Sequence, residues 1–163
     1  MAMSLLIRDA KNEDAVESCE VMRRSIAELC TADHKGDPKV LNRWLGNKKP
    51  AIFRSWIAQP RNNLLVATEG ERIVAVGSVT DGGEITLNYV SPDARFRGVS
   101  KALLAVLERR AAERGCAECR LNSTETARKF YLACGYKETG EPGGRFGTNS
   151  GYRMSKALKP NFE

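Results

Sequence analysis

Basic side chains gather around a glycine between an expected strand and an expected helix, and this stretch is well suited to bind an anion. The basic residues are Arg95, Arg97 and Lys101, and the glycine is Gly98. The first N–H groups of a helix have no acceptor within it, and the helix dipole adds partial positive charge at the same end. The junction therefore predicts a site for a phosphate or pyrophosphate, with a turn that binds nothing as the alternative.

The residues on either side of this turn separate the two elements. Residues 85–90 have the composition of a strand, and apolar residues recur at helical spacing over 99–114. Ser91-Pro92 continues neither element easily, because proline restricts both itself and the residue before it. Gly98 permits a backbone conformation that a Cβ would obstruct, and Gly115 is expected to end the helix in the left-handed region.

Two motifs, in this order, resemble the GNAT superfamily of N-acetyltransferases. Arg95-x-x-Gly98-x-Ser100, preceded by Val90-x-Pro92, is similar to the acyl-CoA pyrophosphate loop of that family, Arg/Gln-x-x-Gly-x-Gly/Ala. Residues 122–136 are similar to its later block, Asn…Ala-x-x-Phe-Tyr-x-x-x-Gly-Phe/Tyr. The resemblance is clear from about residue 64 to the C-terminus.

The loop departs from the family pattern at two positions. Phe96 stands where many members carry glycine, and Ser100 stands at the last Gly/Ala position. Ser100 keeps its N–H and adds a hydroxyl donor. Phe96 restricts the backbone, so the start of the loop is expected to have a different shape.

The resemblance implies acetyl-CoA as co-substrate and transfer of its acetyl group to a primary amine. Because no cysteine lies in a recognisable nucleophile motif, direct transfer in a ternary complex is expected instead of an acyl-enzyme. The residues that it places at the cofactor are Val90, Arg95, Phe96, Arg97, Gly98, Val99, Ser100, Lys101, Asn122 and Tyr131. No metal is implied.

Two residues are candidates for catalysis on this resemblance. Tyr131 matches the family tyrosine near the thioester sulfur, and would donate a proton to the leaving thiolate; packing beneath the sheet is the alternative. Glu84 matches a strand carboxylate that accepts the amine proton through water, and a solvent-facing side chain at the strand end is the alternative.

Two other site residues also have a structural explanation. The alternation of strand 85–90 slips at Tyr89-Val90, which predicts a bulge there, and the resemblance assigns the freed N–H near Val90 to the thioester carbonyl. Asn122 is expected to begin a helix in a capping box with Glu125, and the family adds a contact with the pantetheine arm.

The order of elements predicts an α/β fold, as one domain over 1–163, with a GNAT-like mixed, mostly antiparallel sheet flanked by helices. The expected strands are 4–9, 64–68, 73–79, 85–90, 118–121, 136–139 and 152–157. The expected helices end near 29, begin at 38 and 50, and cover 99–114 and 122–135, with loops at 30–36 and 140–151. Trp44 and Trp56 are expected in the core, with a substrate role as the alternative. The lone His34 is expected in a loop as a surface or hydrogen-bonded residue, with a catalytic role as the alternative.

Composition limits the partners and the location. A length of 163 residues suits one core, and no stretch is long and apolar enough to cross a membrane, so a cytoplasmic protein is expected. Five cysteines do not form a disulfide-scaffold pattern. The net charge of +6 is scattered along the chain, which disfavours nucleic acid and suits a polyphosphate cofactor.

Other points stay open at this stage. The acceptor amine is not specified by any motif, and a homodimer is compatible with the family. A non-catalytic CoA-sensing or protein-interaction domain of the same fold is the alternative function.

Overall fold

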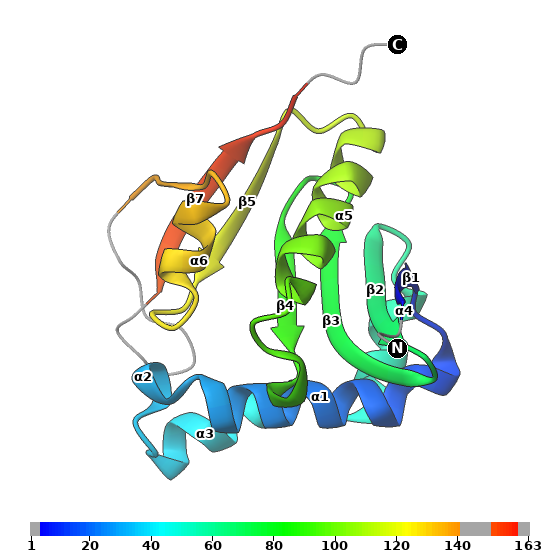
Figure 1. Cartoon of the computed structure of the whole chain (residues 1–163), viewed down its shortest axis with the longest axis vertical. Coiled ribbons are helices and arrows are strands. Elements are labelled where there is room, and N and C mark those ends of the chain that lie inside the picture. The colour runs from blue at the N-terminus through cyan, green and yellow to red at the C-terminus, as the bar shows by residue number, and fades with distance from the viewer. Residues whose placement is uncertain (1–3, 141–150, 160–163) are drawn as a thin grey trace.

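The computed structural model describes residues 4–140 and 151–159, and these form two small antiparallel sheets flanked by helices (Figure 1). The strands are β1 (Leu5–Asp9), β2 (Asn62–Glu69), β3 (Arg72–Thr80), β4 (Ile85–Val90), β5 (Glu118–Ser123), β6 (Lys137–Glu138) and β7 (Tyr152–Ala157). The α-helices are α1 (Ala15–Leu29), α2 (Thr31–His34), α3 (Pro38–Leu45), α4 (Pro50–Ala58), α5 (Val99–Glu113) and α6 (Arg128–Ala133), with short 3-10 helices at Asn12–Asp14 and Pro92–Ala94.

The two sheets meet at one end only. The first has the order β1-β2-β3-β4 and the second β5-β7-β6, all antiparallel. A single parallel bridge joins Glu84 to Arg120, where the Arg120 N–H donates to the Gly83 carbonyl at 2.9 Å. The predicted mixed, mostly antiparallel fold is confirmed. Within the described residues, the only parallel pairing is this bridge.

Helices cover both faces of the first sheet (Figure 1). On one face α5 packs Leu103 and Leu107 against Ala75 in the main core. On the other face α1 and α4 contribute Met22 and Phe53 to a second core. The helix boundaries follow local signals: Asp37 caps α3 by accepting from the Lys39 N–H, Pro38 and Pro50 open α3 and α4, and Gly115 (φ 89°) follows α5.

The predicted bulge at Tyr89-Val90 is wrong, because the register shift lies at Thr86. Tyr89 and Val90 pair regularly with Val76 and Ala75, whereas the step from Leu87 to Ile85 spans one residue of β3. The bulge therefore sends Ile85 and Leu87 into opposite cores instead of one. The sequence alternation slips at Tyr89-Val90 because both faces of the strand are covered there.

Two further expectations are corrected by long-range contacts. Residues 30–36 are not all loop, since they contain the single-turn helix α2. Asn122 does not begin a helix; it lies in β5 opposite Arg153, and α6 begins only at Arg128. The loop predicted at 140–151 lies almost entirely outside the described residues.

Candidate active site

A cavity of about 690 Å³ lies between β4 and β5. The two strands separate from the Glu84–Arg120 bridge toward α1 and α2, and Figure 1 shows them running in the same direction. Residues from Ile85 to Val90 line one wall, and residues from Leu121 to Thr124 line the other. The cavity extends from the loop before α5 to the side chains of α3 and α4. Its volume is therefore sufficient for a small-molecule ligand, and different elements line its two ends.

The N-terminus of α5 lines one end of this cavity. Gly98 is the N-cap residue with φ 77°, and no side chain caps the helix there among the described residues. The Ala102 N–H donates to the Gly98 carbonyl, so the N–H groups of Val99, Ser100 and Lys101 precede the hydrogen-bonding pattern of the helix. All three residues line the cavity. An anion placed here would meet unpaired amide donors and the positive end of the helix dipole.

The residues before Gly98 divide into two groups. Arg95 and Phe96 line the cavity, and the guanidinium carbon of Arg95 lies 4.4 Å from the centre of the Phe96 ring. Phe96 has φ 63°, so the residue that replaces the family glycine adopts the conformation that glycine favours. Arg97 does not line the cavity, and its guanidinium instead pairs with Glu69 at 2.7 Å.

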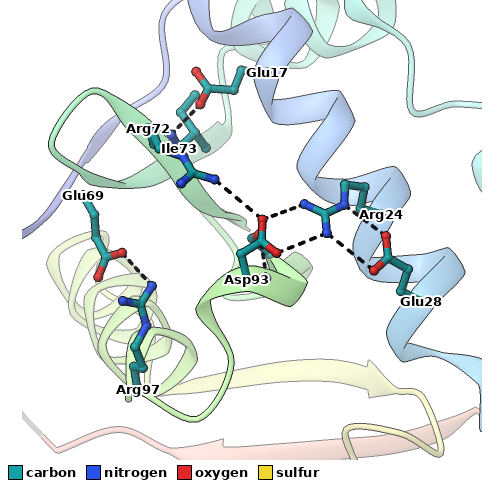
Figure 2. A network of polar contacts seen from close by, with 9 residues as sticks. Glu17, Arg24, Glu28, Glu69, Arg72, Ile73, Asp93 and Arg97 are labelled. Carbon is teal, nitrogen blue, oxygen red and sulfur yellow. Dashed lines mark hydrogen bonds and ion pairs between the residues drawn. The ribbon is translucent and has the colours of Figure 1, made fainter.

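An ion-pair network holds this loop against α1 and the β2–β3 hairpin (Figure 2). Asp93 pairs with Arg24 of α1 at 2.9 Å and with Arg72 of β3 at 3.6 Å. Its N–H donates to the Ser91 hydroxyl. Hydrogen bonding to Arg24 lowers the pKa of the Asp93 carboxyl. Arg24 also pairs with Glu28 of its own helix, at 3.0 Å. Sequence reasoning missed this network, because its partners come from separate elements.

Tyr131 of α6 lies inside the cavity, and its hydroxyl accepts a hydrogen bond from the Asn88 amide of β4 at 3.1 Å. That contact uses the oxygen of Tyr131 as an acceptor and leaves its own proton for another group. Burial raises the pKa of Tyr131 to about 12, so the hydroxyl stays protonated near neutral pH. The amide oxygen of Asn88 is buried without a hydrogen-bond partner among the described residues.

Backbone donors of β4 also face this space. The Ser91 N–H donates to the Val74 carbonyl of β3 at 2.8 Å. Successive residues of an antiparallel strand direct their N–H groups to opposite sides, so those of Val90 and Asn88 point away from β3. Because β4 is the edge strand of its sheet, that side is the cavity. Val90 can thus present an N–H there without a bulge at its own position.

Asp33 of α2 organises the turn in front of α6, and no motif had singled it out. Its carboxylate accepts from the N–H groups of Glu125 and Thr126 at 2.7 and 3.2 Å, and from the Thr126 hydroxyl at 2.6 Å. The Thr124 hydroxyl accepts from the Ala127 N–H. These contacts replace the capping box expected at Asn122, whose side chain is exposed on β5 at the cavity wall.

Glu84 lies outside the large cavity, and Asn122 is the one other predicted site residue that lines a pocket with it. Glu84 is at the closed end where the two sheets meet, with its carboxylate 3.6 Å from Arg120. It lines a small recess with Arg120 and Asn122, but it is not among the residues that line the large cavity.

The far end of the cavity is aromatic and amide-rich. Trp44 is buried, as expected, and its indole N–H donates to the Tyr89 hydroxyl at 3.0 Å. Trp56 is half-buried and lines the cavity near the amide side chains of Gln59 and Asn62. His34 is hydrogen-bonded, as one of the two expectations for it had it, but it lies buried in α2 and not in a loop: Nδ1 accepts from the Gly36 N–H, and Nε2 lies 3.1 Å from the Ile26 carbonyl.

The described residues contain no group of three or more His, Cys, Asp or Glu side chains able to hold a metal ion. They also contain no helix with the length and hydropathy needed to span a bilayer.

Comparison with known proteins gives one family and many similar folds. A model described as an acetyltransferase (GNAT) domain matches residues 31–158. No curated protein matches the chain. A GCN5-related N-acetyltransferase from Rhodopseudomonas palustris has 24% identity and a TM-score of 0.83, covering 97% of this chain and 99% of its own.

Two further structures have the same fold. The PaiA N-acetyltransferase from Thermoplasma acidophilum, in complex with coenzyme A, has 21% identity and a TM-score of 0.81, covering 96% of this chain and 100% of its own. The aminoglycoside 6'-N-acetyltransferase from Enterococcus faecium has 15% identity and a TM-score of 0.72, covering 97% and 99%.

Proposed function

The chain belongs to the GNAT acetyltransferase family, and from that premise we propose that it transfers an acetyl group from acetyl-CoA to a primary amine. One observation carries the proposal: the uncapped N-terminus of α5 lines the same cavity that holds the Tyr131 hydroxyl. The structurally similar acetyltransferase from Thermoplasma acidophilum binds coenzyme A, and the donor set here suits the diphosphate of that cofactor. The proposed cofactor residues are those that the resemblance implies, and Arg97, which pairs with Glu69 through one guanidinium nitrogen, keeps further N–H donors for the diphosphate.

We assign the groups on the two walls of the cavity different roles in acetyl transfer. The N–H of Val90, which points away from β3, would polarise the thioester carbonyl and stabilise the developing oxyanion. Tyr131, a neutral hydroxyl held by Asn88, would donate its proton to the sulfur as the C–S bond breaks. The amine nitrogen forms the new bond to the acetyl carbon, and its surplus proton leaves to a base or to water.

Direct transfer agrees with the state of the cysteines. An acyl-enzyme would require a nucleophilic thiolate near the thioester. Cys30 lines the cavity, but burial raises its pKa to about 12, and burial also raises the pKa of Cys119 to about 12. Thiols in this state are poor nucleophiles at neutral pH.

The acceptor enters at the side of the cavity formed by α3 and α4. Trp56, Gln59 and Asn62 line this side, and they offer apolar contact and neutral hydrogen bonds. Related folds act on chemically different amines, including the aminoglycosides named for the enzyme from Enterococcus faecium, so the fold does not select the acceptor.

Binding and thiol release together test this proposal. Calorimetry should show saturable acetyl-CoA binding, and a panel of small amines, peptide N-termini and lysine peptides should reveal at least one acceptor by thiol release. Absence of binding at millimolar acetyl-CoA would refute the proposal. Binding without transfer to any amine would indicate the non-catalytic CoA-binding alternative.

A further inference from the structure

Phe96 is unusual in both exposure and backbone conformation. The residue is 91% exposed, more than any other large apolar residue in the described part of the chain. Its φ of 63° lies in the left-handed region, which a bulky side chain adopts at a cost in strain. A single exposed apolar residue is ordinary on a protein surface, so exposure alone would not indicate a function. Here exposure and strain coincide at the mouth of the cavity.

The position of Phe96 matches one end of the co-substrate. Tyr131 is buried and marks the inner part of the cavity, whereas the highly exposed Phe96 marks its solvent-facing edge, the mouth, just before the N-terminus of α5. If the diphosphate lies at that N-terminus and the acyl arm runs inward, the nucleoside on the other side of the diphosphate leaves through the mouth. Phe96 lines that mouth immediately before Arg97 and Gly98.

One face of the Phe96 ring is covered by an arginine, and the other face is free to stack with a ligand. The Arg95 guanidinium covers one face, with its carbon 4.4 Å from the ring centre. Because the residue is 91% exposed, the other face is open to solvent. Purine bases stack on such faces in nucleotide-binding sites, where each stack changes the affinity severalfold or more.

We propose that Phe96 binds the adenine of the co-substrate, which stacks on the open face of the ring while Arg95 stacks on the other. This inference rests on the proposed function, since it needs acetyl-CoA to bind at α5. On this proposal Phe96, which stands where many family members carry glycine, determines the specificity for the nucleotide half of the co-substrate.

Two variants and three ligands test the proposal by calorimetry. Phe96→Gly removes the ring and retains the backbone conformation, and Phe96→Trp retains an aromatic face. The ligands are coenzyme A, phosphopantetheine, which has the arm but no nucleoside, and adenosine bisphosphate, which has the nucleotide but no arm. Phe96→Gly should weaken coenzyme A and adenosine bisphosphate about fivefold or more while leaving phosphopantetheine unchanged, and Phe96→Trp should bind all three as the wild type does.

The outcomes separate this proposal from the function that it assumes. Equal weakening of all three ligands, or of none, in Phe96→Gly would overturn the stacking role while leaving the acetyltransferase proposal intact. Failure of the unaltered protein to bind coenzyme A would refute both. In Phe96→Trp, indole fluorescence that changes with adenosine bisphosphate but not with phosphopantetheine would support stacking by an independent signal, provided that the wild type, which already has Trp44 and Trp56 at the cavity, shows no such change.

Discussion

Tyr131 and Tyr136 are two buried tyrosines whose hydroxyl groups have different surroundings. The Tyr131 hydroxyl lies in the cavity beside Asn88, whereas the Tyr136 hydroxyl donates to Glu108 at 2.9 Å. Their rings pack edge to face, with centroids 5.6 Å apart. A tyrosine-to-phenylalanine substitution can therefore be compared at a proposed catalytic residue, Tyr131, and at a neighbouring structural residue, Tyr136.

Tyr131→Phe should lower kcat by about a hundredfold, because general acid catalysis typically contributes on that order or more. The KM for acetyl-CoA should change little, since the hydroxyl acts on the leaving sulfur. Thiol release measures both constants. Burial raises the pKa of Tyr131 to about 12, so titration of this group should reduce the wild-type rate only as the pH approaches that value.

Tyr136→Phe is the matched control for this change. It removes a hydroxyl bonded to Glu108 and should leave kcat unchanged, with an effect confined to thermal stability. Equal losses of kcat in both variants would show that packing, and not proton donation, explains the Tyr131 result.

Glu84→Gln tests the other predicted catalytic residue. A base has to reach the amine directly or through one water, and Glu84 lies outside the lining of the large cavity beside Arg120. We therefore expect kcat to stay within about twofold of the wild type. A steep loss of kcat in Glu84→Gln would instead support Glu84 as the base.

At the scale of elements, the loop before α5 forms ion pairs with α1 and β3 through Arg24 and Arg72, which do not line the cavity. Asp93 connects the loop to α1 through Arg24 and to β3 through Arg72 (Figure 2). These side chains are exposed, so their contribution to global stability is small and salt-sensitive. Their effect should appear in the position of the loop.

Asp93→Asn should raise the KM for acetyl-CoA severalfold with little change in kcat, because the loop loses its attachment to Arg24 and Arg72. Glu28→Gln is the control, since Glu28 pairs with the same Arg24 but does not belong to the loop. The pKa of Asp93 is lowered by Arg24, so the wild-type pairing should persist at neutral pH and weaken only as the pH falls below the ordinary value of about 3.9. An unchanged KM in Asp93→Asn would contradict this role.

Asp33 fixes the turn before α6 through hydrogen bonds, as Asp93 fixes the loop before α5 through ion pairs. Asp33→Ala leaves the N–H groups of Glu125 and Thr126 without this acceptor, and each lost hydrogen bond to a charged group costs about 1.5–3 kcal/mol. The midpoint of thermal unfolding should fall by several degrees, and kcat should fall because the turn before Tyr131 is released. Asp37→Ala, which removes the exposed cap of α3, should lower the midpoint less and leave kcat unchanged. The reverse order of effects in the two variants would refute the assignment.

At the scale of the whole molecule, two sheets share one parallel bridge and enclose a cavity beyond it. A ligand that contacts both walls should therefore stabilise the folded state. At a hundredfold excess over Kd, binding contributes about 2.7 kcal/mol. For a chain of this size that corresponds to an increase of about 5–10 °C in Tm with acetyl-CoA, measurable by scanning calorimetry.

Gly98→Ala should largely abolish this increase, because an alanine at φ 77° is strained and displaces the amides that receive the diphosphate. Gly36→Ala is the matched control: Gly36 has φ 74°, also has open space around its Cβ position, and does not line the cavity. Both variants should lose similar stability without ligand, but only Gly36→Ala should retain the acetyl-CoA shift. Retention of the shift in Gly98→Ala would place the ligand elsewhere.

The sequence alone determined the features that depend on neighbouring residues. Strand Ile85–Val90, the turn at Gly98 and helix Val99–Glu113 follow from alternation, helical spacing and the sterics of glycine and proline, which act over a few positions. The ordered motifs were sufficient for the family, and the fold that it implies is confirmed.

The tertiary structure alone decided which distant groups meet. Arg24 and Asp93 are 69 positions apart, and Asp33 and Thr126 are 93 apart, so no local pattern could indicate either contact. The bulge at Thr86, the pairing of Arg97 with Glu69 and the separation of Glu84 from the cavity likewise depend on how sheets and helices pack against each other. Backbone preferences are set by adjacent atoms, whereas the partner of a charged side chain is set by which elements the folded core brings together.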